Sequence, residues 1–120
     1  WAIHEALDQL AEKANFIAYP YLASSGVVNI TAADKVVFLD MDTTAGVGIV
    51  NLPLANSIPV GRFYVIKDAG SNATVNNITV YVAPGDYIDF AGTTSDTIST
   101  DSGYVQFYNN GTGYMIYSKG

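Results

Sequence analysis

The chain has no cysteine and a single histidine, and these two shortages exclude whole classes of site. Without cysteine, neither disulfides nor thiolate metal sites can stabilise the fold. With His4 as the one histidine, a zinc site within a single chain does not fit. Serine and threonine are abundant but have no accompanying base, which excludes a nucleophile triad within one chain. We therefore expect a protein that is not an enzyme and that needs no cofactor.

Charged residues are also scarce, and basic ones most of all. Five Lys and Arg stand against eleven Asp and Glu, for a net charge of −6. Nucleic-acid binding needs basic side chains clustered on one face, and no such cluster is present, so we expect no nucleic-acid partner. The charged fraction of 13% is about half the usual share. This indicates that much of the surface lies against other copies of the chain.

Long hydrophobic runs are missing as well. Apolar residues make up 49% of the sequence, yet no uninterrupted run approaches the roughly 20 residues that cross a bilayer. The N-terminus also lacks the basic region and apolar core of a signal peptide. We expect no membrane insertion. Because the chain opens at Trp1 rather than at Met, we expect it to be a fragment of something longer.

The segment 1–17 is the one stretch that predicts a helix. Its apolar residues recur at spacings of four, three, four and three, as in the heptad seam of a coiled coil. The seam consists of Ile3, Leu7, Leu10, Ala14 and Ile17. Leu at position a with Ile at position d favours three or four strands over two. We expect residues 1–23 to be the end of a trimeric coiled-coil stalk; an amphipathic helix packed on its own domain is the alternative.

From residue 24 onward the sequence predicts only strands and turns. About eight to ten short β-rich runs follow one another at spacings of about 8–12 residues, which is typical of a sandwich, jelly roll or barrel. The last hairpin is the clearest: 104–108 alternates, 109–113 has turn residues, and 114–117 returns. The sequence therefore predicts a mainly β protein, in which 24–120 form an antiparallel β-sandwich or jelly-roll-like head.

A series of short motifs in this region occurs in a fixed order. In sequence they are Val50-Asn51-Leu52-Pro53; Gly61, Tyr64, Ile66, Lys67 and Asp68; Gly70 and Ala73; Asn76 to Val80; Gly85, Asp86 and Ile88; and Gly111 or Gly113 with Tyr114 and Ile116. With these motifs the chain resembles a β-rich domain common in the fibre and spike proteins of tailed bacteriophages. Two departures are Tyr114, where many relatives have Trp, and the loop 40–46, which has no counterpart.

The resemblance implies a homotrimeric domain on a virion appendage, on the tail or the capsid. Its partners would be two further copies, other virion proteins upstream and a host cell-surface glycan. The function would be display, assembly or attachment to the host surface, and the family pattern contributes no catalytic residues. A different class of function, a carbohydrate-binding module of a secreted bacterial protein, is the alternative.

Tyrosines are the main candidates for contacts. In the strand 104–108, Tyr104, Gln106 and Tyr108 share one face, while Val105 and Phe107 share the other. If the second pair points into the core, an exposed tyrosine row remains, suited to stacking on glycans or to protein interfaces. The full candidate set is Tyr104, Gln106, Tyr108, Tyr114 and Tyr117. The row could equally be a trimer interface or core edge, a host-ligand contact, or scattered surface tyrosines.

Two pairs of aspartates are weaker candidates. Asp40 and Asp42 lie two apart in a predicted loop, where closely spaced carboxylates can bind a hard cation such as Ca²⁺. They lack the glycine and distal glutamate of a calcium loop, so we expect a solvated turn and no metal. Asp86 and Asp89 could form the carboxylate pair of a glycosidase, but Asp86 in Pro-Gly-Asp is better explained as a turn cap.

Overall fold

The structure is a computed structural model that describes residues 21–34 and 38–120. This part of the chain is mainly β, with a single turn of 3₁₀ helix. The elements are β1 (Tyr21–Ser24), β2 (Gly26–Asn29), β3 (Phe38–Asp42), β4 (Gly48–Asn51), η1 (Ala55–Ser57), β5 (Phe63–Asp68), β6 (Ile78–Tyr81), β7 (Ser95–Ile98), β8 (Tyr104–Asn109) and β9 (Tyr114–Lys119). Within the described ranges, no helix has the length and apolar character needed to span a bilayer.

The predicted helix 1–17 lies outside the described residues, as does His4. The same holds for the predicted seam, Ile3, Leu7, Leu10, Ala14 and Ile17. The first described strand starts at Tyr21, whereas the sequence analysis begins the head at residue 24. The division into a stalk and a head therefore stays a prediction.

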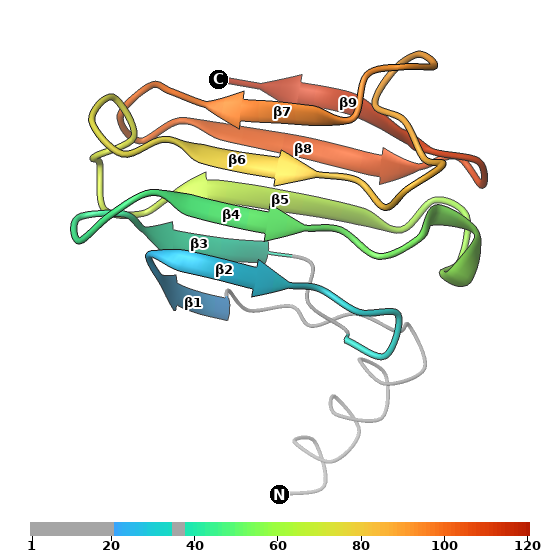
Figure 1. Cartoon of the computed structure of the whole chain (residues 1–120), viewed down its shortest axis with the longest axis horizontal. Coiled ribbons are helices and arrows are strands. Elements are labelled where there is room, and N and C mark those ends of the chain that lie inside the picture. The colour runs from blue at the N-terminus through green and yellow to red at the C-terminus, as the bar shows by residue number, and fades with distance from the viewer. Residues whose placement is uncertain (1–20, 35–37) are drawn as a thin grey trace, which may run out of the picture.

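The strands form two mixed sheets, and the chain alternates between them. The five-stranded sheet has the order β1-β3-β5-β8-β9, and the four-stranded sheet has the order β2-β4-β6-β7. Each of the first three passes adds one strand to each sheet: β1 with β2, β3 with β4, and β5 with β6. Figure 1 shows these passes following one another, from β1 and β2 at one edge to β7 and β9 at the opposite edge.

The prediction of purely antiparallel pairing is wrong, because β1–β3, β2–β4, β3–β5 and β4–β6 pair in parallel. The connections give the reason. Only Ser25 separates β1 from β2, which is too short for the two-residue turn of a hairpin. Gly26 follows with a φ of 111°, a conformation that residues with side chains rarely adopt. The chain is thereby turned into the other sheet, and the next strand of the first sheet arrives in the same direction.

Inward-pointing side chains of both sheets form one core. In β5, Tyr64 and Ile66 are buried while Phe63 and Val65 point outward, and β6 likewise buries Ile78 and its neighbour two residues on. Burying one large apolar side chain stabilises the fold by about 1.5–3 kcal/mol. The core contains Ile30, Leu39, Met41, Val50, Leu52, Ala55, Ile58, Tyr64, Ile66, Ala73, Ile78, Val80, Ile88, Ile98, Val105, Phe107 and Tyr114.

The predicted C-terminal hairpin is present: β8 and β9 pair antiparallel around the loop 110–113. These strands complete the five-stranded sheet, since β8 also pairs antiparallel with β5.

Lys119 of β9 lies with its Nζ 2.8 Å from a carboxylate oxygen of Asp96 in β7. Because β7 and β9 are the last strands of their sheets, this ion pair connects the two sheets at that edge.

Asp68, at the end of β5, holds two loops against the core. Its Oδ2 accepts the backbone N–H groups of Asn72, Ala73 and Ser102 at 2.9, 3.0 and 2.9 Å. Ser71 and Ser102 have φ angles of 53° and 59°, a left-handed conformation that costs a residue with a side chain about 1–2 kcal/mol. The charge-assisted bonds to the buried carboxylate offset this cost and fix both loops at the end of β5.

Candidate binding face

Aromatic side chains gather on the outer side of the five-stranded sheet. They point outward because their neighbours in sequence are core residues: Leu39 follows Phe38, and Val105 and Phe107 alternate with Tyr104 and Tyr108. We call this surface the aromatic face. It consists of Phe38, Phe63, Tyr104, Tyr108 and Tyr117.

Strand register brings these residues together from distant parts of the chain. Phe63 of β5 lies directly opposite Tyr108 of β8, so the two side chains are cross-strand neighbours. In β9 the register shifts, because Phe107 pairs with Ile116 while Gln106 pairs with Ser118. Tyr117 is the extra residue of this β-bulge. Bulges re-aim a side chain, and here Tyr117 projects over the neighbouring strand.

The rings meet edge to face. The centroids of Tyr108 and Tyr117 are 6.4 Å apart at an interplanar angle of 75°, and those of Phe38 and Phe63 are 6.3 Å apart at 82°. Pairs of this kind contribute about 0.5–1.5 kcal/mol beyond the area that they bury. Tyr117 nevertheless remains 74% exposed, and Phe63 and Tyr108 are 37% and 36% exposed. The rings are thus held in place while much of their surface stays open.

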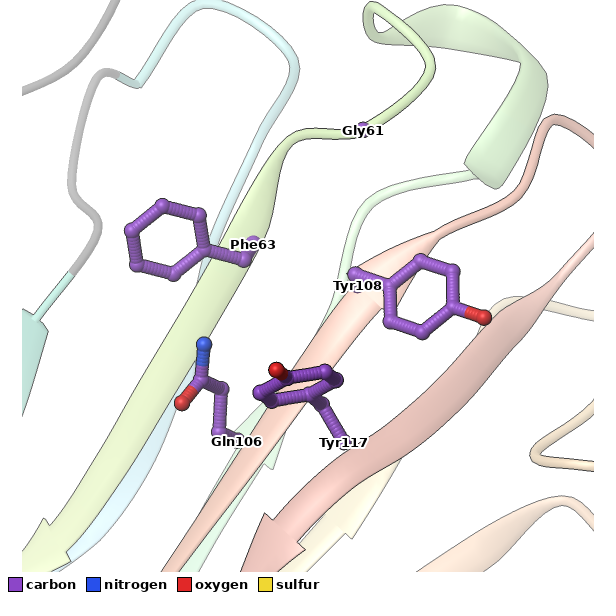
Figure 2. Close-up of a pocket in the computed structure, with 5 residues that line it drawn as sticks. All are labelled: Gly61, Phe63, Gln106, Tyr108 and Tyr117. Atoms are coloured by element: carbon purple, nitrogen blue, oxygen red, sulfur yellow. The ribbon is translucent and has the colours of Figure 1, made fainter.

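A shallow groove lies among these side chains, with a volume of about 320 Å³. This is the lower end of the roughly 300–1,000 Å³ that is typical of small-molecule sites. Figure 2 shows the ring of Tyr117 between the side chains of Gln106 and Tyr108, with the ring of Phe63 above Gln106 in this view. The groove is lined by Gly61, Phe63, Gln106, Tyr108 and Tyr117.

The polar side chains of the groove differ from Tyr104 in that they form no hydrogen bond within the described part of the chain. Tyr104 shares a 2.7 Å hydrogen bond with the hydroxyl of Ser118, and its ring covers Gly120. By contrast, the side chains of Gln106, Tyr108 and Tyr117 make no hydrogen bond to any other residue of the described ranges. The groove therefore offers an amide and two hydroxyls beside apolar rings, the mixture found in small-molecule sites.

Charged side chains flank the groove but do not line it. Lys67 also points to the outer side of β5, where it lies in register with Asp40 of β3. Its ammonium group donates to the backbone carbonyl of Ser102, outside the groove. With one charge of each sign nearby and an overall charge of −6, the groove has no feature that would attract an anion.

The outer side of the four-stranded sheet is built differently. Asn51 Nδ2 donates to Asn29 Oδ1 at 2.8 Å across β4 and β2, and the hydroxyls of Thr79 and Thr97 are 3.3 Å apart across β6 and β7. Tyr81 is exposed on this side but forms no ring pair with another described residue. The aromatic face is therefore specific to one of the two sheets.

The structure brings together Tyr104, Gln106, Tyr108 and Tyr117 on one face but places Tyr114 elsewhere. Tyr114 is fully buried in the core, where its hydroxyl donates to the backbone carbonyl of Pro53 at 2.6 Å. It shares no surface with the other four. Phe63 and Gly61 were not predicted as site residues. Alternation in 62–67 could have indicated Phe63, because Tyr64 and Ile66 share the other, buried face of the strand.

The aspartate candidates cap backbone groups. Asp42 Oδ1 accepts the backbone N–H and the hydroxyl of Thr44 at 2.9 and 2.6 Å. Asp86 accepts the N–H of Ala55 and Asp89 that of Ile116, each at 2.8 Å. Asp40 and Asp42 both lie within β3, so the prediction that a loop begins at residue 40 is wrong. Among the residues that the structure describes, no group of three or more acidic or histidine side chains could hold a metal ion.

The cap at Asp42 predicts a pH-dependent effect of Thr44→Val. The hydroxyl and the backbone N–H of Thr44 lower the pKa of Asp42 below its ordinary 3.8. A carboxylate whose pKa is lower in the folded than in the unfolded protein stabilises the fold at pH values above its unfolded pKa. This stabilisation is lost as the pH falls through the folded-state pKa. Thr44→Val should therefore destabilise the protein at pH 7, and the difference from the wild type should shrink below about pH 4. Urea unfolding followed across this range measures it.

Thr97→Val is the matched control, because the hydroxyl of Thr97 faces that of Thr79 and no carboxylate. Its effect on the urea midpoint should not change between neutral and acidic pH. If the effect of Thr44→Val were equally constant, the hydroxyl would act through packing and not through the charge of Asp42.

No known protein family matches the chain, and no curated protein shows detectable sequence similarity to it. Functional conclusions therefore depend on the residues themselves, above all on the aromatic face.

Proposed function

We propose that this domain is a non-catalytic structural and interaction module of a trimeric bacteriophage fibre or spike, on the tail or the capsid. It would display on the virion a surface for attachment to the host. In this proposal the two sheets form a β-sandwich head, and residues 1–23 form the end of a coiled-coil stalk. The observation that carries the proposal is the aromatic face with its exposed Tyr117.

Composition supports the proposal from a second direction. Only 13% of the residues are charged, and the outer sides of both sheets carry aromatic, amide and hydroxyl side chains. Large exposed apolar side chains include Tyr117 at 74% and Phe63 at 37% exposure, which line one groove on the five-stranded sheet. Contiguous exposed apolar surface marks contacts with other molecules. A fibre domain places such surface against its own copies or against a receptor.

Oligomeric state tests the proposal directly. Light scattering on the chain at micromolar concentration should give the mass of three chains, against 12.8 kDa for one. Replacing the predicted seam residues Leu7 and Leu10 with Asp should convert the trimer to a monomer with the same β-rich circular dichroism spectrum. The same heptad pattern predicts Glu5 and Glu12 on the outer side of the helix, so exchanging both for Gln is the control and should leave the mass unchanged. A wild-type mass of one chain would contradict the fibre assignment.

A carbohydrate-binding module of a secreted bacterial protein is the second candidate, and the groove is the observation that favours it. Uncharged side chains, three of them aromatic, line the groove. A module of this kind would work as a monomer without a helical stalk. Sugar binding by a protein with the mass of one chain would favour this candidate over the fibre.

A further inference from the structure

We propose that the groove lined by Gly61, Phe63, Gln106, Tyr108 and Tyr117 binds a neutral saccharide, with one sugar ring stacked on Tyr117 and its hydroxyl groups bound by Gln106. This inference deepens the proposed attachment function and rests on it for its biological role. The binding itself depends only on the groove.

The size and shape of the groove select a small, flat group. Its volume of about 320 Å³ corresponds to the small end of ligand sites and cannot enclose a long peptide. The open ring of Tyr117, 74% exposed and propped against Tyr108 at 6.4 Å, presents an apolar surface. The C–H face of a pyranose is a ligand surface that matches an aromatic ring of this kind, because it is apolar while its rim carries hydroxyl groups.

The polar atoms select hydroxyl groups. The side chain of Gln106 has two N–H donors and one carbonyl acceptor, which can bind adjacent sugar hydroxyls as both donors and acceptors. Neither this amide nor the hydroxyls of Tyr108 and Tyr117 are bonded to another described residue, so a ligand need not break an internal bond to reach them. Tyr104, whose hydroxyl is bonded to Ser118, lies outside the groove lining.

The charges select a neutral ligand over an acidic one. None of the five lining residues is charged. Arg62, between Gly61 and Phe63, is buried and donates to the carbonyl of Asp34. Lys67 of β5 donates to the carbonyl of Ser102. A protein of charge −6 repels anions at long range. Oligosaccharides bearing carboxylates or phosphates should therefore bind more weakly than neutral oligosaccharides of the same length.

Titration of the isotopically labelled full chain, followed by ¹⁵N–¹H correlation spectra, tests the proposal. The probes are maltohexaose, cellohexaose and hexa-N-acetylchitohexaose as neutral saccharides, with oligogalacturonate of equal length as the acidic one. At least one neutral probe should shift amide signals of β8 and β9 near the groove, with a dissociation constant in about the millimolar range. Tyr117→Ala and Gln106→Leu should each weaken that binding about tenfold or more.

Tyr81→Ala is the matched control, because Tyr81 is 41% exposed on the other sheet and belongs to no groove or ring pair of the described residues. It should leave the binding unchanged. The proposal is overturned if no neutral probe shifts the groove signals, if Tyr81→Ala weakens binding as much as Tyr117→Ala, or if oligogalacturonate binds more tightly than the neutral probes.

Light scattering on the same samples separates this inference from the fibre assignment. A trimer that binds no neutral saccharide would overturn the inference and leave the fibre assignment standing. A monomer that binds through Tyr117 and Gln106 would support the inference and contradict the fibre assignment.

Discussion

Replacing Asp68 with alanine is expected to lower the free energy of unfolding by about 3–5 kcal/mol. The carboxylate is buried, and its Oδ2 accepts three backbone N–H groups, those of Asn72, Ala73 and Ser102, at 2.9–3.0 Å. Without it, these donors lose their partner: the bond to Ala73 is buried and the bonds to Asn72 and Ser102 are part-buried. Each unsatisfied buried group costs about 1–3 kcal/mol. Urea unfolding monitored by circular dichroism measures the loss.

Asp101→Ala is the control for a capping carboxylate at the surface. Asp101 accepts only the N–H and hydroxyl of Thr74, in an exposed loop, so its removal should cost much less stability than the removal of Asp68. Asp68→Asn should fall between the two, since an amide oxygen still accepts but without charge. A loss at Asp68→Ala no larger than that at Asp101→Ala would show that the two loops hold their left-handed residues without the carboxylate.

Asp68 also illustrates what local sequence can predict. The turn 68–72 was identifiable from its Asp, Gly, Ser and Asn residues, because these types favour turns wherever they occur. Alternation likewise predicted which residues of β8 share a face, since side chains in a strand alternate between faces. The hairpin of β8 and β9 followed from the turn residues at 109–113. All of these depend on residues within a few positions of one another.

Strand order could not be predicted in this way. Val50 and Val80 are paired neighbours in β4 and β6, although 30 positions separate them in the sequence. Alternation indicates which residues of a strand share a face but not which strand lies beside it. Parallel pairing here results from connections that cross between sheets, such as the single residue Ser25 between β1 and β2. A short spacer of this kind reads as an ordinary turn until both sheets are known.

For the same reason, only the part of the candidate site that lies on one strand could be predicted. Tyr104, Gln106 and Tyr108 lie on one strand, so alternation sufficed to place them on one face. Phe63 joins them only through the register of β5 with β8, a contact between residues 45 positions apart. Tyr114 and Tyr117 lie three positions apart on β9, so they point to opposite sides, and alternation alone does not say which one is buried.

Truncating the buried Tyr114 should cost far more stability than truncating the exposed Tyr117. Tyr114→Ala should lower the free energy of unfolding by about 3–5 kcal/mol, the loss expected for truncating a large buried aromatic side chain. Tyr114 is fully buried, its ring lies 6.3 Å from that of Tyr64, and its hydroxyl donates to Pro53. Tyr117→Ala, which removes an exposed ring and its pair with Tyr108, should lower the stability by only about 0.5–1.5 kcal/mol. Thermal and urea unfolding of both variants measure the difference.

Tyr114→Phe removes the hydroxyl but keeps the ring, and it should change how the stability depends on pH. It removes the 2.6 Å bond to the carbonyl of Pro53, at a cost of about 1–2 kcal/mol near neutral pH. Burial raises the pKa of Tyr114 far above its ordinary 10.0. The unfolded chain therefore ionises this tyrosine above about pH 10 while the folded chain keeps it neutral, so stability falls as the pH rises there. Tyr114→Phe should make this alkaline loss shallower. An alkaline loss as steep in Tyr114→Phe as in the wild type would show that Tyr114 is not a group that ionises only on unfolding.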